Sequence, residues 1–276
     1  QRQMAGPLEN YSSLPTLLPT YWEPVYREPV VAPATDSRGL PMRSRELLSF
    51  GVGAQTSAFD LVGRHAYRAF TNVFTSGGQW EAGGVYSYRG LGNPILSVRG
   101  EQTWGAAGQL LAGPSQDTVF VLERERSASA SVTFLSNRWR RNLAVTVTGG
   151  LGWDNQELLN GDLKPTAAYT LRQPVARFTD FRASISYATS RTHSFQTGRA
   201  RGISLFVEGK VRRQLSLTDS LMGVEGFDRS FEELSGRLRA YVPLWEGGHA
   251  THVLALQVSG GAARGPKAQF GHFRLG

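Results

Sequence analysis

The sequence predicts an all-β fold, an antiparallel transmembrane β-barrel of which this chain supplies about 11 strands. Three observations indicate it. Apolar and polar residues alternate with a period of two, the alternating runs are longer than most soluble strands, and long and short connections follow one another. Alternation of this kind is typical of strands whose two faces meet different surroundings.

The alternation gives each run one apolar and one polar face. In the run 178–190, for example, Phe181 and Ile185 alternate with Arg182 and Ser184. Because the polar set carries charges, we expect it to line a wet interior while the apolar set faces lipid. The residues expected to point outward are Leu143, Val145, Val147, Phe181, Ile185, Leu205, Val207, Leu254 and Leu256. Those expected to point inward are Arg99, Arg182, Lys210 and Arg237.

The expected strands are long enough to cross a membrane. Globular strands average about 5 to 6 residues, whereas a membrane barrel needs about 9 to 11. We expect strands at 20–30, 46–59, 65–76, 79–90, 95–106, 118–135, 142–155, 178–190, 201–215, 231–244 and 252–264.

The connections between these strands fall into two classes. The shorter ones are 60–64, 91–94, 136–141, 191–200 and 245–251, and the longer ones are 31–45, 107–117, 156–177 and 216–230, with the hairpin at 77–78 as the exception. Short turns on one rim and long loops on the other are typical of outer-membrane barrels. We therefore expect the loops 107–117, 156–177 and 216–230 to share the outer rim, opposite the turns 60–64, 136–141 and 245–251.

Composition narrows the classes of function. The chain has 276 residues and no cysteine, so disulfide frameworks and thiolate metal sites are not expected. No stretch approaches the roughly 18 continuous apolar residues of a membrane helix. The net charge of +8 is typical of a phosphate-bearing partner, either nucleic acid or envelope lipid, or else of a basic surface or lumen with no particular ligand. Because the arginines are spread singly between apolar residues, we expect no nucleic acid partner.

The candidate reactive groups do not form a catalytic or metal-binding pattern. His249 and His252 lie three residues apart in a turn, a spacing that does not focus two imidazoles on one point, and His65 and His193 add no third ligand. No nucleophile elbow frames a serine. Paired glycines such as Gly83 and Gly84 lie inside strands, where they indicate bends or crowded spots in the wall and not phosphate cradles. We expect no enzyme, no catalytic residue, no metal and no cofactor.

Aromatic residues gather near the ends of the expected strands. Barrels place aromatics in girdles at the two lipid interfaces, and ordinary core packing is the alternative. They are Trp22, Tyr26, Trp80, Tyr86, Tyr88, Trp104, Trp139, Trp153, Tyr187, Tyr241 and Trp245. Arg138, Arg140 and Arg141 flank Trp139 on an expected short turn, where they either meet lipid phosphates at the periplasmic rim or are solvated. We expect the charged run 123–126 in a strand portion that projects beyond the membrane.

Four stretches resemble the bacterial surface antigen barrel domain, of the BamA/TamA-like outer-membrane assembly superfamily. Residues 11–25 (YSSLPTLLPTYWEPV) resemble the opening of that barrel, and residues 60–67 (DLVGRHAY) resemble its first periplasmic turn. Residues 252–262 (HVLALQVSGGA) look like its eleventh strand, and residues 273–276 (FRLG) are similar to the opening of its sixth outer loop.

The resemblance implies a truncated barrel, since family members have sixteen strands. It divides the chain into a proline-containing periplasmic linker, 1–19, and a partial outer-membrane barrel domain, 20–276, ending in an outer loop. The chain stops before the Arg-Gly-aromatic motif that the family carries in that loop. The proline-rich opening is similar to members in which a periplasmic β-propeller precedes the barrel, so such a domain is an expected partner in the same polypeptide.

The implied function is the insertion or translocation of polypeptides in the outer membrane of a Gram-negative cell envelope. Expected partners are outer-membrane lipid or lipopolysaccharide and unfolded outer-membrane polypeptides. In this interpretation the first strand, from Tyr21 to Val30, forms one side of a seam that Pro24 and Pro29 weaken, because proline donates no ladder hydrogen bond. The alternative is that the two prolines only end a periplasmic linker. Two alternatives stay open, a passive pore or structural outer-membrane barrel and a soluble β-protein that binds an anionic ligand.

Overall fold

A large antiparallel sheet forms most of the protein. The computed structural model describes residues 14–19, 21–32, 44–112, 117–159, 175–189, 201–218, 230–247 and 250–265. The eleven strands of the sheet, in spatial order, are β1 (Glu23–Arg27), β4 (Gly51–Phe59), β5 (His65–Phe74), β6 (Trp80–Tyr88), β7 (Ile95–Ala112), β8 (Asp117–Arg138), β9 (Arg141–Leu159), β10 (Val175–Ala188), β11 (Gly202–Thr218), β12 (Phe231–Gly247) and β13 (Ala250–Arg264). Two further strands, β2 (Val30–Ala32) and β3 (Arg45–Leu48), form a small sheet, and a 3-10 helix spans Leu14–Leu17.

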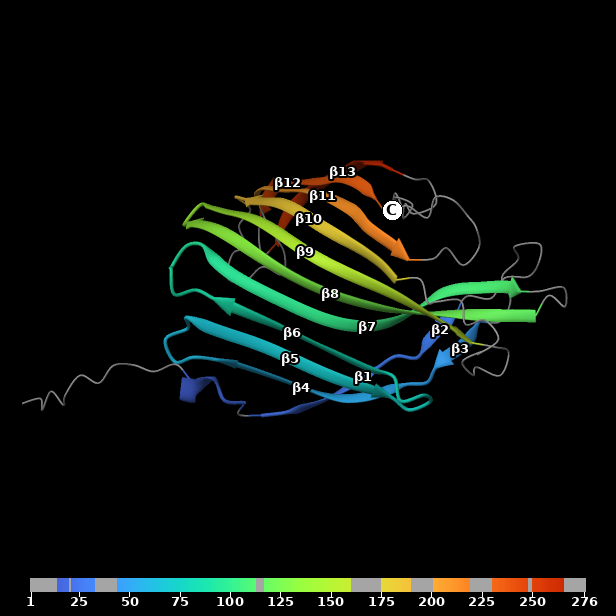
Figure 1. Ribbon diagram of the computed structural model, residues 1–276. Coiled ribbons are helices and arrows are strands. Elements are labelled where there is room, and N and C mark those ends of the chain that lie inside the picture. Colours follow the sequence, from blue (N-terminus) through green and yellow to red (C-terminus); the bar gives the residue numbers. More distant parts are fainter. Residues whose placement is uncertain are drawn as a thin grey trace, which may run out of the picture.

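The large sheet is a curved meander (Figure 1). From β4 onward every strand pairs with the next one in the chain. β1 pairs directly with β4, and β2 and β3, which lie between them in the sequence, form the separate small sheet. The expected all-β, antiparallel architecture with eleven strands is confirmed. In the described part of the chain, β1 and β13 are the two edges of an open sheet. No helix of the described residues is long and apolar enough to cross a membrane.

The structure corrects the first two expected strands. The expected strand 20–30 ends at Arg27, and the expected strand 46–59 is interrupted at Ser49 and Phe50. The flanking residues instead pair as β2 and β3, in which Val30 lies opposite Leu48. Burial explains the difference. Val30, Ala32, Leu47 and Leu48 form a core with Phe74, Trp104, Phe120, Leu122 and Leu159.

The expected loop at 107–117 is also wrong, because β7 and β8 run through most of it. Cross-strand pairs such as Leu110 opposite Val119 extend the ladder to residues 112 and 117. Pairing with a β-branched partner strand overrides the weak strand propensity of the run 105–108 (GAAG). Loop length therefore separates the rims less cleanly than expected. The loops 156–177 and 216–230 overlap β9, β10 and β11 at their ends, and their middle parts lie outside the described residues.

The meander itself separates two rims. The β4–β5, β6–β7 and β8–β9 turns lie together at one end of the sheet, which we call the turn rim, as Figure 1 shows. The β2–β3 pair and the extended ends of β7 and β8 lie at the other end, the loop rim. The expected turns 60–64 and 136–141 fall at the turn rim. The expected turn 245–251 is shorter than predicted, because β12 continues to Gly247 and β13 begins at Ala250, and residues 248–249 lie outside the described part of the chain.

The register sorts side chains onto two faces. Val145 lies opposite Phe134 and Ile185, and Ile185 lies opposite Val207, so one face collects apolar residues from neighbouring strands. All nine residues expected to point outward lie on this face, and the four expected inward lie on the other. The charged face is the concave one, since Arg27 on β1 reaches Glu81 on β6 across β4 and β5.

Candidate functional site: the charged concave face

The concave face carries most of the charged residues of the large sheet. Successive side chains of a strand point to opposite faces, so the register assigns each residue to one of them. The charged residues of the concave face are Glu23, Arg27, Arg68, Glu81, Arg99, Glu101, Glu123, Glu125, Asp154, Asp180, Arg182, Glu208, Lys210, Arg212, Glu233, Arg237 and Arg239. Acidic and basic groups alternate there, and several are joined in ion pairs.

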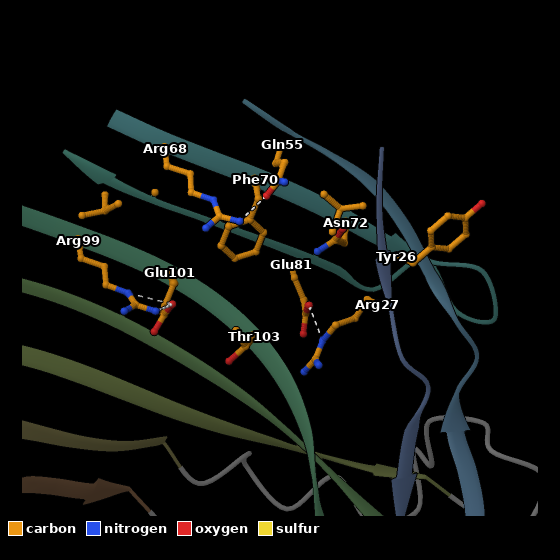
Figure 2. Close-up of a pocket in the computed structure, with 13 residues that line it drawn as sticks. Tyr26, Arg27, Gln55, Arg68, Phe70, Asn72, Glu81, Arg99, Glu101 and Thr103 are labelled. Atoms are coloured by element: carbon orange, nitrogen blue, oxygen red, sulfur yellow. Dashed lines mark hydrogen bonds and ion pairs between the residues drawn. The ribbon is translucent and has the colours of Figure 1, made fainter. Parts of the chain in front are cut away.

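A cavity of about 470 Å³ lies on this face against β1, β4, β5, β6 and β7. Figure 2 shows three arginines, Arg27, Arg68 and Arg99, beside the carboxylates of Glu81 and Glu101. Gln55, Asn72 and Thr103 are further polar residues of the lining, and the ring of Phe70 lies among them. The cavity therefore presents both cationic and anionic groups.

Glu81 is the buried anchor of this cavity, with 1% of its surface exposed. One carboxylate oxygen accepts a hydrogen bond from Arg27 Nε at 3.1 Å, and the other accepts one from the Trp104 backbone N at 2.9 Å. A buried carboxylate is costly unless it is paired and hydrogen-bonded, and both conditions are met here. Glu81 thus ties β1 to β6 and β7.

The other two arginines make more open contacts. Arg68 Nη2 donates to Gln55 Oε1 at 2.6 Å, and Gln55 Nε2 donates in turn to Glu23 Oε2 at 2.8 Å. Arg99 Nη2 lies 2.6 Å from Glu101 Oε2. Both contacts are exposed to solvent, so they can exchange for a ligand at low cost.

A second charged cluster lies further along the concave face, on β10, β11 and β12. Arg212 donates from Nε and Nη2 to the two oxygens of Asp180 at 2.7 and 2.8 Å. Its guanidinium carbon also lies 3.9 Å from the centroid of the Phe178 ring and 5.5 Å from that of Phe231. Such a bidentate, stacked arginine has its fork geometry fixed by its neighbours.

The position of the Phe178 ring depends on the glycine opposite it. It lies opposite Gly152 on β9, and a Cβ added to that glycine would lie 2.1 Å from the Phe178 ring. Gly152, Phe178 and Arg212 therefore form a continuous stack on the concave side. The alternation in the sequence places Arg212 on the polar face, but neither this stack nor the Arg27–Glu81 pair carries a local sequence signal.

The convex face carries an uncharged, largely apolar band. Its residues run from Leu143 to Leu151 on β9 and from Leu234 to Val242 on β12, nine positions on each strand. Within this band the described strands place no Asp, Glu, Lys or Arg on the convex face. Charges begin immediately beyond it, towards the loop rim, at Arg126, Glu157, Arg177, Arg213, Glu232 and Arg264.

The expected aromatic girdles are placed unevenly. Tyr26, Trp80, Tyr86, Tyr88, Trp153 and Tyr187 lie on the convex face near the two ends of the band. Trp139 is in the β8–β9 turn and Trp245 lies opposite His252 near the turn rim. Trp104 is a correction. It is 5% exposed and packs in the core with residues of the β2–β3 pair. Burial of its indole is possible because Nε1 donates a hydrogen bond to the Trp80 carbonyl oxygen at 3.0 Å. Tyr241 lies on the concave face.

His65 and His252, the two histidines in the described part of the chain, lie on distant strands. His65 contacts Tyr86 and Tyr88 on the convex face, His252 is on β13, and His193 and His249 lie outside the described residues. In the part of the chain that the structure describes, no three His, Asp or Glu side chains are grouped as metal ligands would be.

The side chains of the charged run 123–126 alternate between the two faces of β8. Glu123 and Glu125 lie on the concave face, and Arg124 and Arg126 lie on the convex face.

Comparison with known proteins finds no matching family model, no similar characterised protein and no similar solved structure.

Proposed function

We propose that the eleven-stranded sheet is part of the wall of an outer-membrane β-barrel, with the convex face in lipid and the concave face lining a wet interior. The observation that carries the proposal is the uncharged convex band, set against a concave face rich in paired charges. A membrane barrel places its apolar set outside and its polar set inside, whereas a soluble barrel fills its interior with the apolar set.

The height of the band supports this. On β9 the uncharged convex stretch from Leu143 to Leu151 covers nine positions. At about 3.4 Å per residue that is roughly 31 Å of strand. A tilt of about 40° reduces it to roughly 23 Å, close to the outward apolar band of about 25 Å in transmembrane barrels.

Exposure of the band argues against a soluble β-protein. Leu96, Val98, Phe134, Leu151, Phe181, Ile185, Leu238, Leu254, Leu256 and Val258 are all exposed large apolar residues of the convex face. Soluble monomers rarely expose contiguous apolar patches larger than a few hundred Å². A surface of this kind needs an apolar environment to cover it.

Within that class we propose a role in guiding polypeptides into or through the membrane. Two features support it, the resemblance to the assembly superfamily and the weakness of β1. β1 has five residues, includes Pro24, and pairs with β4 at five positions, whereas β8 and β9 pair at nineteen. A short edge strand that contains a proline forms few main-chain hydrogen bonds with its neighbour, and a client strand can add to an exposed edge by main-chain hydrogen bonds.

A passive pore is the second candidate, favoured by the charged lining of the concave face. Vesicles containing the purified protein distinguish the two. A polypeptide-inserting protein should accelerate the folding of a urea-unfolded barrel client into those vesicles relative to protein-free ones. Ion conductance without any acceleration would leave the passive pore. Failure to enter vesicles at all would overturn the membrane proposal.

A further inference from the structure

The turn rim has an unusual pairing of exposed apolar and basic side chains. Leu61 is 83% exposed in the β4–β5 turn and Trp139 is 88% exposed in the β8–β9 turn, and Leu91 is exposed in the β6–β7 turn. Each of these residues has an arginine within three positions, namely Arg64, Arg140 and Arg89. Three separate turns of the meander thus repeat one combination at one end of the sheet.

Among the described residues, the arginines of this rim form no ion pair with a carboxylate. Six of them are exposed at or beside the turns, and none makes an ion pair with a described residue: Arg64, Arg89, Arg138, Arg140, Arg141 and Arg201. Asp60 is the carboxylate whose side chain is described in these turns, and it is fully buried and accepts a hydrogen bond from the His65 backbone N at 2.8 Å. Among the described side chains, arginines therefore outnumber carboxylates at this rim, which carries an excess of positive charge.

The loop rim differs in this respect. There acidic and basic residues stand side by side, as with Arg45 and Glu46 at the start of β3, and Arg213 pairs with Glu232. Among the described residues, the excess of positive charge is therefore found at the turn rim.

We propose that the turn rim binds the headgroups of anionic glycerophospholipids in the adjacent leaflet. This rests on the proposed membrane function and names a partner for it. Arginine forks match phosphate oxygens, and basic residues at a membrane surface attract anionic lipids. The apolar residues favour a lipid over free phosphate, because Trp139, Leu61 and Leu91 gain from the acyl boundary that lies beside a headgroup. The guanidinium carbon of Arg140 lies 5.6 Å from the centroid of the Trp139 ring, so a basic and an apolar group are side by side in this turn.

Electron paramagnetic resonance with spin-labelled lipids tests the proposal. The full chain is reconstituted in phosphatidylcholine bilayers that contain a trace of either spin-labelled phosphatidylglycerol or spin-labelled phosphatidylcholine. The motionally restricted fraction of each probe gives the relative association of the two lipids with the protein. We expect a several-fold preference for phosphatidylglycerol, which weakens at high salt.

Two matched variants locate the preference. Arg138→Gln with Arg140→Gln should clearly lower the preference, because four of the six rim arginines remain, whereas Arg237→Gln with Arg239→Gln, an equally spaced pair on the concave face, should leave it unchanged. Inorganic phosphate should compete no better than sodium chloride of equal ionic strength. Equal association of both probes with the unmodified protein, an unchanged preference in the rim variant, or specific competition by phosphate would each overturn the proposal. Absence of any restricted lipid would overturn the membrane proposal, and this one with it.

Discussion

Arg27 Nε on β1 lies 3.1 Å from Glu81 Oε2 on β6, although β4 and β5 separate the two strands in the sheet. Neighbouring strands are about 4.8 Å apart, so a flat sheet would keep these strands roughly 14 Å apart. The pair is possible because the sheet curves sharply here and both side chains are on its concave side. Gly51 and Gly53, on the concave side of β4, add no side chain of their own between the two partners.

Glu81→Leu should lower the free energy of unfolding by about 2–3 kcal/mol, because it leaves the buried Trp104 N–H without an acceptor and Arg27 without its partner. Glu101→Gln, at a more exposed pair, should cost no more than about 1 kcal/mol. Urea unfolding of the protein in detergent micelles, followed by tryptophan fluorescence, measures both. Equal costs for the two variants would show that Glu81 is not a structural anchor.

Gly152→Ala should destabilise the sheet by about 1–3 kcal/mol, since the new methyl group overlaps the Phe178 ring and forces it off Arg212. Gly149→Ala is the matched control, because a Cβ at Gly149 meets no atom within 4 Å. The same unfolding experiment compares them. A Gly152→Ala protein as stable as the control would contradict the stack described above.

Asp180→Asn and Arg212→Gln should show coupled effects, because the two side chains share a bidentate pair on the concave face. We expect an interaction free energy of about 1–2 kcal/mol from a double-mutant cycle. Simple additivity of the two single substitutions would mean that the pair contributes nothing to stability.

Val145→Arg should cost about 2–4 kcal/mol in a bilayer, because Val145 lies within the convex apolar band. Thr146→Arg, its neighbour on the concave face, should be nearly neutral. Unfolding in lipid vesicles gives both values. If the arginine at position 146 were the more damaging one, the assignment of the two faces to lipid and water would have to be reversed.

Much of the fold follows from the sequence because period-two alternation is a local signal. It predicts the eleven strands and the face on which residues such as Leu143 and Arg182 lie. It does not predict β2 and β3, since Val30 and Leu48 are held there by burial against Trp104 and Phe120, which are distant in the chain. The extension of β7 to Ala112 depends likewise on its pairing with β8.

The candidate site was less accessible to such reasoning. Alternation places Arg27, Glu81 and Arg212 on the polar face, but their partners depend on the curvature of the sheet and on the size of neighbouring side chains. A glycine at position 152 shows no local sign that Phe178 will cover it. The turn rim can be predicted from the sequence only in part. The basic turn around Trp139 is visible in the sequence, whereas its alignment with Arg64 and Arg89 requires the meander.

The most direct test of the two-faced sheet is a spin-label scan of β9, one label at a time from Leu143 to Gly149, with the protein reconstituted in lipid bilayers. Collision with oxygen reports lipid exposure, and collision with a water-soluble nickel chelate reports exposure to water. The account predicts that oxygen access peaks at 143, 145, 147 and 149, and that nickel access peaks at 144, 146 and 148. Nickel access at the odd positions, or shielding of those positions from oxygen, would contradict it.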